Sequence, residues 1–232
     1  MKFKDPLIKT KIIKRYKRFL SDLELSTGEI INAHVPNTGS MKTCWEPGWT
    51  AFVTKNDDPK RKMKYTWEIT DTGEALICVN TNLPNKIVKE ALENGQIREV
   101  SEYKTVISEK KVLDSRIDFF LQQEGLPDVY LEVKNVTLKG PQREALFPDA
   151  VSTRGQKHLR DLIELKKQGN RAIMLYLINR TDVDKFSPAA DIDPEYARLL
   201  VEAQKAGVEI LPYQTQITPE EIVVSNKVDY SL

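Results

Sequence analysis

Cysteine and histidine are scarce in this sequence, which contains two of each among its 232 residues. Cys44 and Cys78 are too few for the disulfide framework of a small secreted domain, so we expect both thiols to be reduced. His34 and His158 lie far apart, and no cysteine stands near either one at the spacing of zinc ligands. The sequence therefore argues against a structural zinc site, and we expect any bound metal ion to be held by oxygen atoms.

Long apolar runs are also missing. No stretch approaches the roughly 20 apolar residues of a membrane span, and the opening residues 1–19 carry charges throughout, with no apolar segment of signal-peptide length. We therefore expect a cytoplasmic protein that does not contact a membrane. With 40% hydrophobic and 30% charged residues, the composition is typical of a soluble globular chain, long enough for one large domain or two small ones.

A strong excess of one charge is absent too, since the formal net charge is +1. Residues 1–83 hold 14 Lys and Arg against 10 Asp and Glu, and the remaining residues hold 21 against 24. The first third is therefore +4 and the rest −3, which permits a polyanion such as DNA to contact the first third. It does not require such a partner, because a run of charge is more often a solvated face.

Residues 7–79 contain short runs of alternating apolar and polar residues, separated by turn sequences such as "STGE" and "PNTGS". This spacing, without an internal helix, predicts an all-β domain over residues 1–82, with an OB-like barrel as the natural candidate. Aromatic residues alternate there with Lys and Arg, as on a face that binds single-stranded nucleic acid, although most of these rings could equally form the core. The basic candidates for nucleic-acid binding are Lys14, Arg15, Lys17 and Arg18.

The pattern changes to helical spacing near residue 84, where a predicted helix has Asn85 as its N-cap and Gly95 as its end. Two more helices are expected, one over about residues 148–168 and one from the N-cap Asp193 to Gly207. Between them lies the apolar run 171–178, which reads as a buried strand. Strand, helix and strand in this succession predict a parallel pair with a right-handed crossover, so residues 83–232 should form an α/β domain with a mixed sheet.

The most informative segment is a charged hairpin over residues 115–138. If it folds symmetrically about Gly125, residues whose numbers sum to 250 face each other, which places Asp118 opposite Glu132 with Cβ atoms about 5 Å apart. Two such carboxylates repel unless one is protonated or a cation lies between them. Oxygen ligands suit Mg²⁺ or Mn²⁺, and Lys134 on the same face as Glu132 could orient an attacking water.

A plainer interpretation of the same hairpin remains open. Arg116 with Glu132 and Asp118 with Lys134 could form two diagonal salt bridges on a solvated face. Periodicity by itself does not choose between a metal site and this lattice of charges.

Several strings resemble a known family. Asp118 on one strand and "LEVK" on the next, followed by a basic helix, resemble the PD-(D/E)XK nuclease core. Five longer strings resemble the sugar fermentation stimulation protein A family over nearly the whole chain: "HVPNTGSM", "TNLPNKIVKEAL", "SRIDF", "YLEVKNVTL" and "FPDAVSTRGQKHLRDL". The resemblance implies an OB-like domain joined to a restriction-endonuclease-like domain, in a family described as DNA-binding and linked to the regulation of sugar utilisation, maltose in particular.

Carried over by position, the resemblance implies a site for Mg²⁺ or Mn²⁺. Its metal ligands would be Asp118, Glu132, the main-chain carbonyl of Val133 and an additional carboxylate from Glu90, and Lys134 would be the catalytic lysine. Ile117 stands where the motif name has proline, a departure that is common in the superfamily.

The helix after residue 147 could present polar side chains to phosphates. Asp149 near its start is either the N-cap, which is the favoured interpretation, or a ligand. Gln156 and Lys157 are the preferred site members, Arg154 and Arg116 are candidate nucleic-acid contacts, and His158 is interpreted as a packing residue. In the first domain, the turn Asn37, Thr38, Gly39 and Ser40 could hold a phosphate or close over the second domain.

Three functions compete at this point. The first is a DNA-binding protein with a metal-dependent deoxyribonuclease site, and the second is a DNA-binding transcriptional regulator that lacks catalysis. The third is hydrolysis of a small phosphoester, with the first domain only covering the site.

Overall fold

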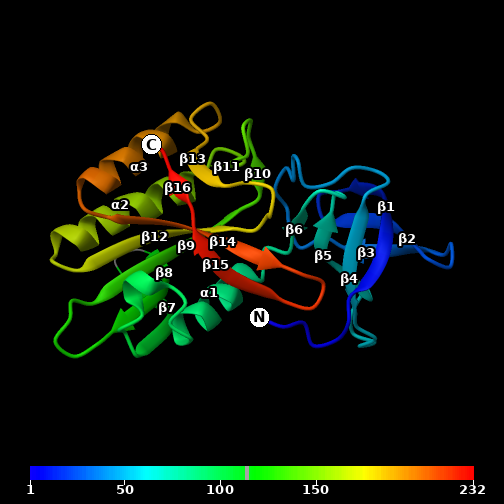
Figure 1. The fold of residues 1–232 in the computed structure, drawn as a ribbon, viewed down its shortest axis with the longest axis horizontal. Coiled ribbons are helices and arrows are strands. Elements are labelled where there is room, and N and C mark those ends of the chain that lie inside the picture. The colour runs from blue at the N-terminus through cyan, green and yellow to red at the C-terminus, as the bar shows by residue number, and fades with distance from the viewer. Residues whose placement is uncertain (113–114) are drawn as a thin grey trace.

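The computed structural model describes residues 1–112 and 115–232, and it shows two domains joined end to end. A β-barrel forms the first domain, and a sheet covered by helices forms the second (Figure 1). Within the described residues, none of the helices is long and apolar enough to cross a membrane.

The first domain is a closed barrel of the expected OB type. Its strands are β1 (Ile8–Tyr16), β2 (Leu20–Leu25), β3 (Ile30–His34), β4 (Thr50–Lys55), β5 (Tyr65–Asp71) and the short β6 (Leu76–Cys78). They pair in the order β3-β2-β1-β4-β5-β6, and β3 also pairs with β5 in parallel, which closes the barrel. Alternate residues point inward, so the apolar members of each strand meet in one core.

Most aromatic rings of this domain belong to that core rather than to a binding face. Trp67 is fully buried, and Trp45, Trp49 and Tyr65 pack against the core while partly buried. Phe19 is the large exposed exception, at 45% exposure. The composition that suggested stacking platforms for single-stranded nucleic acid is therefore explained mainly by packing.

The second domain has the expected mixed sheet. Its strands are β7 (Thr105–Val112), β8 (Ser115–Gln122), β9 (Val129–Val136), β12 (Arg171–Ile178), β14 (Glu209–Ile217) and β15 (Ile222–Lys227). They lie in the order β15-β14-β12-β9-β8-β7, with β12 parallel to both β9 and β14 and the other neighbours antiparallel. β12 is buried over nearly its whole length because helices cover both faces of the sheet.

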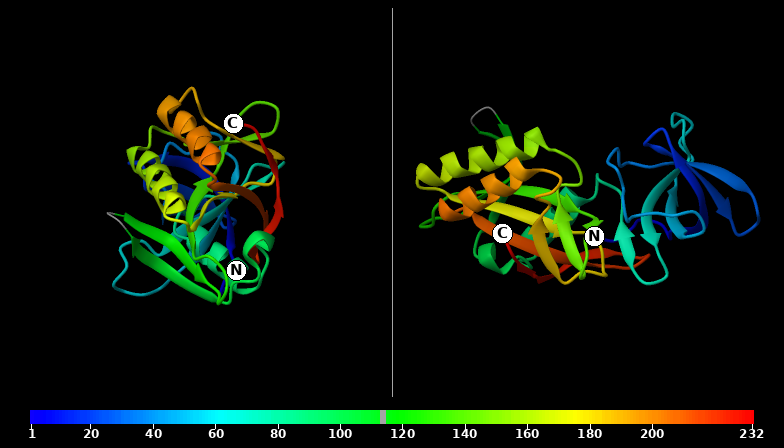
Figure 2. Two further views of the ribbon diagram at one scale, coloured as in Figure 1. Left: turned by 90° about the vertical axis from the view of Figure 1, so that its left-hand side faces the viewer. Right: turned by 90° about the horizontal axis from the view of Figure 1, so that it is seen from above.

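Helices α1 (Pro84–Glu93), α2 (Thr153–Lys167) and α3 (Pro194–Lys205) provide this cover. α2 and α3 pack side by side on one face, as Figure 2 shows, and α1 packs on the other. The N-cap of α3 is Asp193, as expected, since its carboxylate accepts a hydrogen bond from Tyr196 N.

Two other predicted caps are wrong. α1 begins at Pro84 after Leu83, and the Asn85 side chain donates to Asp118 instead of capping. α2 begins later than expected, because Ser152 is its N-cap and accepts from Gly155 N, while Asp149 reaches toward the first domain.

A small third sheet was not anticipated. It contains β10 (Leu138–Lys139), β11 (Glu144–Phe147), β13 (Lys185–Pro188) and β16 (Asp229–Tyr230), paired in the order β10-β11-β13-β16. A short 3-10 turn, η1 (Arg98–Val100), precedes β7. The third sheet matters because β11 leads directly into the segment that faces the first domain.

Candidate active site

The hairpin of β8 and β9 has the predicted register. Phe119 pairs with Leu131, and Leu121 pairs with Val129, so paired residue numbers sum to 250. One residue beyond this ladder, Asp118 Oδ2 accepts a hydrogen bond from Val133 N at 2.8 Å. Both carboxylates of the hairpin, Asp118 and Glu132, line one cavity of about 310 Å³.

Asp118 is held by two donors from different elements. Val133 N of β9 donates to Oδ2, and Asn85 Nδ2 of α1 donates to Oδ1 at 2.8 Å. Burial raises the pKa of Asp118 above its ordinary value, the Glu132 carboxylate raises it further, and the two hydrogen bonds offset only part of this.

Glu132 is the buried carboxylate of the site, with 2% of its surface exposed. Its Oε1 accepts from Lys134 Nζ at 2.8 Å and contacts His158 Nδ1. Burial alone would raise the pKa of Glu132, but the hydrogen bond to His158 and the charge of Lys134 outweigh burial and hold this pKa below its ordinary value. The pKa of Asp118 is thus raised and the pKa of Glu132 lowered, and opposite shifts of two neighbouring carboxylates are frequent at functional sites.

The alternative lattice of surface salt bridges is wrong. Arg116 pairs with Glu109 at 3.0 Å, and both side chains are largely exposed. Lys134 pairs with Glu132 on its own strand, and neither of these two side chains is on a solvated face, since 11% and 3% of them are exposed.

His158 of α2, interpreted from the sequence as a packing residue, is buried and also contacts the charged groups of the site. It is 4% exposed, and its Nδ1 lies 2.9 Å from Lys134 Nζ as well as against Glu132. Arg154, one helical turn earlier, donates from Nε to His158 Nε2 at 3.4 Å. The sequence contains a signal that His158 faces the site. Residues four apart share a helix face, and Arg154, four residues before His158, is a candidate nucleic-acid contact.

The preferred residues of α2, by contrast, point elsewhere. Gln156 donates to Asp193 Oδ1 at 2.9 Å, and Lys157 interacts with Ser115 and with Asp161. Neither lines the cavity, whose walls are Thr81, Pro84, Asn85, Asp118, Glu132, Val133, Lys134, Asn135, Phe147, Ser152, Arg154, Gly155 and His158.

Glu90 also lies outside this cavity. Its Oε1 accepts from the amino group of Met1 at 2.8 Å, and 46% of its side chain is exposed. Within the described residues, the structure shows no group of three or more His, Cys, Asp or Glu side chains that could hold a metal ion.

Two carboxylates nevertheless fit a divalent ion of the Mg²⁺ type. Oε2 of Glu132 is buried and has no hydrogen-bond partner in the described structure, so a buried charge is left with an open coordination position. Mg²⁺ commonly binds one or two protein carboxylates and completes its shell with water and substrate phosphate oxygens. Asp118 and Glu132 could therefore hold such an ion together with a phosphate.

The basic residues proposed for the first domain have diverse positions. Lys14 pairs with Asp22 at 3.1 Å, and Lys17 and Arg18 are exposed at the turn between β1 and β2. Arg15 is turned inward: its Nη2 donates to the carbonyls of Asn37 at 2.8 Å and Gly39 at 3.1 Å. Arg15 thus fixes the shape of the turn that follows β3.

That turn closes over the second domain, which is one of its two expected roles. Ser40 N and Oγ each donate to Asp149 Oδ2 at 3.3 Å. Two other amides of the turn are engaged within the first domain, since Gly39 N donates to Asn37 Oδ1 and Asn37 N donates to Val35 O. The turn therefore does not present the row of free amides that a phosphate nest requires.

Comparisons with known proteins agree with this architecture. The chain matches the family models described as "Sugar fermentation stimulation protein RE domain" over residues 82–221 and "SfsA N-terminal OB domain" over residues 13–79. A sugar fermentation stimulation protein homolog from Geotalea uraniireducens (strain Rf4) is 48% identical over 223 residues, covering 96% of each chain. The homolog from Marinomonas sp. (strain MWYL1) is 45% identical over 230 residues, covering 98% of this chain and 89% of the relative.

A solved structure is similar over the same extent. "The structure of Pyrococcus Furiosus SfsA in complex with Ca2+" matches with a TM-score of 0.88 and 26% identity, covering 100% of this chain and 98% of that one.

Proposed function

The chain belongs to the sugar fermentation stimulation protein family, and from this premise we propose that it is a DNA-binding protein that hydrolyses phosphodiester bonds at the cavity between Asp118 and Glu132. The observation that carries the proposal is the buried Oε2 of Glu132, which has no partner in the described structure although it lies beside a second carboxylate and a lysine. A protein interior tolerates such an atom at a site that takes up a ligand. A relative described in complex with Ca²⁺ supports an oxygen-ligated divalent ion.

Asp118 and Glu132 would hold Mg²⁺ or Mn²⁺, which supplies Lewis-acid activation of the phosphate and of a bound water. The lowered pKa of Glu132 keeps its carboxylate ionised at neutral pH. Val133 N and Asn85 Nδ2 fix the rotamer of Asp118, so its carboxylate is oriented before the substrate binds.

Lys134 contributes the positive charge nearest to these carboxylates. Glu132 Oε1 and His158 Nδ1 both lie within 3 Å of Nζ, so the ammonium group is fixed in place. A charge held in this way can orient an attacking water and stabilise negative charge that develops on the phosphate in the transition state. Arg154, exposed at the rim of the same cavity, can contact an adjacent phosphate.

The proposal is tested by incubating the purified protein with single-stranded, duplex and branched DNA in the presence of Mg²⁺ or Mn²⁺. We expect cleavage of at least one substrate, and we expect Glu132→Gln to abolish it. Glu124→Gln is the matched control, because Glu124 lies exposed at the turn of the same hairpin. Equal cleavage by the wild type and Glu132→Gln would indicate a contaminating nuclease, and no cleavage of any substrate would contradict the proposal.

The same experiment separates the hydrolase from a non-catalytic regulator of sugar metabolism. A regulator would bind duplex DNA with a steep dependence on salt, and its binding would be indifferent to Asp118→Asn. Sequence-specific footprints without cleavage would favour that function.

A further inference from the structure

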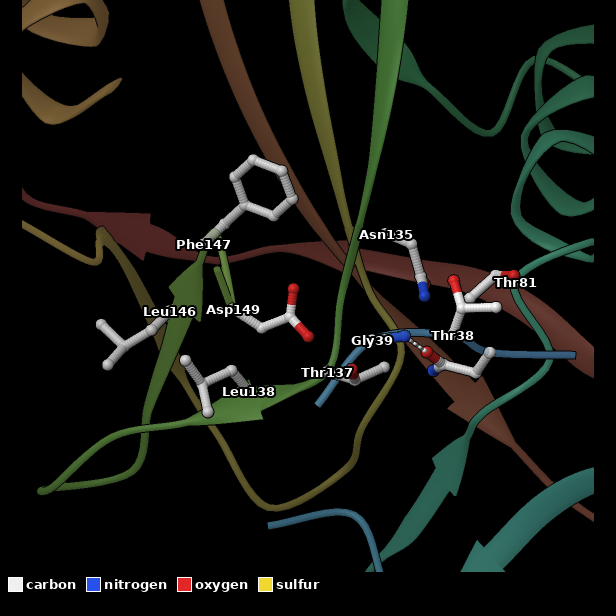
Figure 3. Close-up of a pocket in the computed structure, with 10 residues that line it drawn as sticks. Thr38, Gly39, Thr81, Asn135, Thr137, Leu138, Leu146, Phe147 and Asp149 are labelled. Carbon is white, nitrogen blue, oxygen red and sulfur yellow. Dashed lines mark hydrogen bonds between the residues drawn. The ribbon is translucent and has the colours of Figure 1, made fainter. Parts of the chain in front are cut away.

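A second cavity, of about 280 Å³, lies between the turn after β3 and the second domain (Figure 3). Asn37, Thr38 and Gly39 contribute one wall, and residues between Asn135 and Asp149 contribute the other. It shares Thr81, Asn135 and Phe147 with the cavity that holds Asp118 and Glu132, so the two cavities adjoin. The volume is near the lower bound of about 300 Å³ for small-molecule sites, which suits one planar ring system and excludes a duplex.

The charge of this cavity excludes a phosphate as its occupant. Asp149 is the one ionisable side chain among the residues that line it, all of which belong to the described part of the chain. The nearby guanidinium of Arg15 is engaged with the carbonyls of Asn37 and Gly39. A site with one carboxylate and no cation favours a neutral ligand that offers hydrogen-bond donors.

Asp149 is held so that its carboxylate faces the cavity (Figure 3). Ser40 N and Oγ bind its Oδ2, each at 3.3 Å. The approach is close: a Cβ atom on Gly39 would lie 2.7 Å from Asp149 Oδ2, so no larger residue fits at that position without displacing one of the two. Residue 39 thus has to be glycine for this contact to form.

Asn135 supplies a fixed donor across from this acceptor. Asn179 Nδ2 donates to Asn135 Oδ1 at 2.6 Å, which turns Asn135 Nδ2 into the cavity (Figure 3). Phe147 belongs to the wall shared with the first cavity, and Thr38 and Thr81 also line the second cavity. The cavity thus combines a carboxylate acceptor, an amide donor and an aromatic ring.

We propose that this cavity binds one unstacked guanine base of the nucleic-acid substrate, next to the site of cleavage. The inference rests on the proposed function. Guanine carries two adjacent donors, N1–H and the N2 amino group, which suit the Asp149 carboxylate, and its O6 acceptor suits Asn135 Nδ2. The ring can pack against Phe147, as unstacked bases do on aromatic side chains. Uracil and thymine offer one donor on this edge, so they match the carboxylate less well.

The test uses the full chain and the mononucleotides of guanosine, inosine and adenosine, titrated in EDTA and followed by ligand-observed nuclear magnetic resonance. Inosine differs from guanosine by the N2 amino group alone. We expect guanosine monophosphate to bind about tenfold more tightly than inosine monophosphate, since a matched base contact gives roughly 5-fold to 100-fold discrimination. Equal affinity of the wild type for all three nucleotides would overturn the inference, without any variant being needed.

Variants locate the preference and separate it from catalysis. Asp149→Asn should abolish the preference for guanosine over inosine, while the matched control Asp191→Asn, at an exposed position outside both cavities, should keep it. Glu132→Gln should also keep the preference although it loses cleavage. If Asp149→Asn retains the full preference, the base is bound elsewhere and the inference fails. If the preference depends on Asp149 but no DNA is cleaved, the proposed function fails and the base site stands.

Discussion

Asp182 lies in an ion-pair cluster at the junction of the two domains. Arg180 donates to it from Nε at 2.7 Å and from Nη2 at 3.0 Å, and Lys139 Nζ donates at 2.6 Å. Arg180 is 2% exposed, and its Nη1 reaches the Thr137 carbonyl at 2.6 Å and Thr43 Oγ1 of the first domain at 3.0 Å. Burial would raise the pKa of Asp182, but Arg180 and Lys139 outweigh it and lower this pKa to about 2.

The stability that this cluster contributes follows from the lowered pKa of Asp182. The ordinary value is 3.8, so the difference is about 1.8 pKa units, which at 1.36 kcal/mol per unit is about 2 kcal/mol of stability. Because the pKa is lowered in the folded state, this stabilisation is complete above about pH 5. It falls as the pH drops from about 4 to 2, and roughly half should remain at pH 3.

The perturbation is Asp182→Asn, which removes the charge and leaves Arg180 buried without its carboxylate. We expect the free energy of unfolding of the second domain to fall by at least about 2 kcal/mol at pH 7. Asp184→Asn is the control two residues away, because Asp184 pairs with Arg143 and both side chains are 59% exposed. Exposed pairs contribute about 0 to 1 kcal/mol, so the control should change little.

Urea denaturation can follow each domain separately. All three tryptophans lie in the first domain, and the three α-helices of the described residues lie in the second. Tryptophan fluorescence therefore reports on the barrel, and the helical signal in far-ultraviolet circular dichroism reports on the second domain. We would reject this expectation if Asp182→Asn lowers the free energy of unfolding by no more than Asp184→Asn does at pH 7. It is also refuted if the difference between wild type and Asp182→Asn is as large at pH 3 as at pH 7.

Further expectations concern the site and its supports. Lys134→Met should lower kcat for DNA cleavage about 100-fold, the usual effect of removing one transition-state donor, as single-turnover kinetics would measure. His158→Asn, which can keep a hydrogen bond to Lys134, should retain more activity than His158→Leu at saturating DNA. Gly39→Ala should displace Asp149, and nucleotide titrations should show a reduced guanosine preference. Gly155→Ala places a Cβ atom 2.8 Å from Ser152 Oγ and 3.0 Å from the Tyr196 ring, and thermal unfolding should show a loss of about 1–3 kcal/mol.

Much of the fold could be predicted because it depends on local periodicity. Alternation along β8 and β9 fixes their inward faces, and a turn at Gly125 fixes their register, which is why Asp118 and Glu132 were expected together. The two wrong N-cap predictions show what local sequence patterns cannot predict. Asn85 is an adequate N-cap by residue type, but it donates to Asp118, a partner 33 positions away in the sequence. No local pattern contains that contact.

Residues on α2 show a related limit. A polar helix face near residues 154–160 was visible in the sequence, but the rotation of the helix about its axis depends on packing against β12 and α3. That rotation brings His158 to Lys134, turns Gln156 toward Asp193 and turns Lys157 toward Ser115 of β8. A difference of one or two positions in sequence corresponds to 100° or 200° around a helix, so an uncertain rotation is enough to exchange the site residues.

The junction of the domains is the part that sequence patterns could not supply, and it explains why Asp149 was assigned to the wrong role. As a carboxylate ahead of a helix it looks like a cap, but Ser152 is the N-cap and its hydroxyl accepts from Gly155 N. Asp149 is not needed as a cap, and its carboxylate accepts hydrogen bonds from Ser40 of the first domain. The same carboxylate also lines the cavity that adjoins the pair of carboxylates, where the proposed base would contact it. The OB-like domain therefore contributes to the site by completing a wall beside it, more than by offering its aromatic rings.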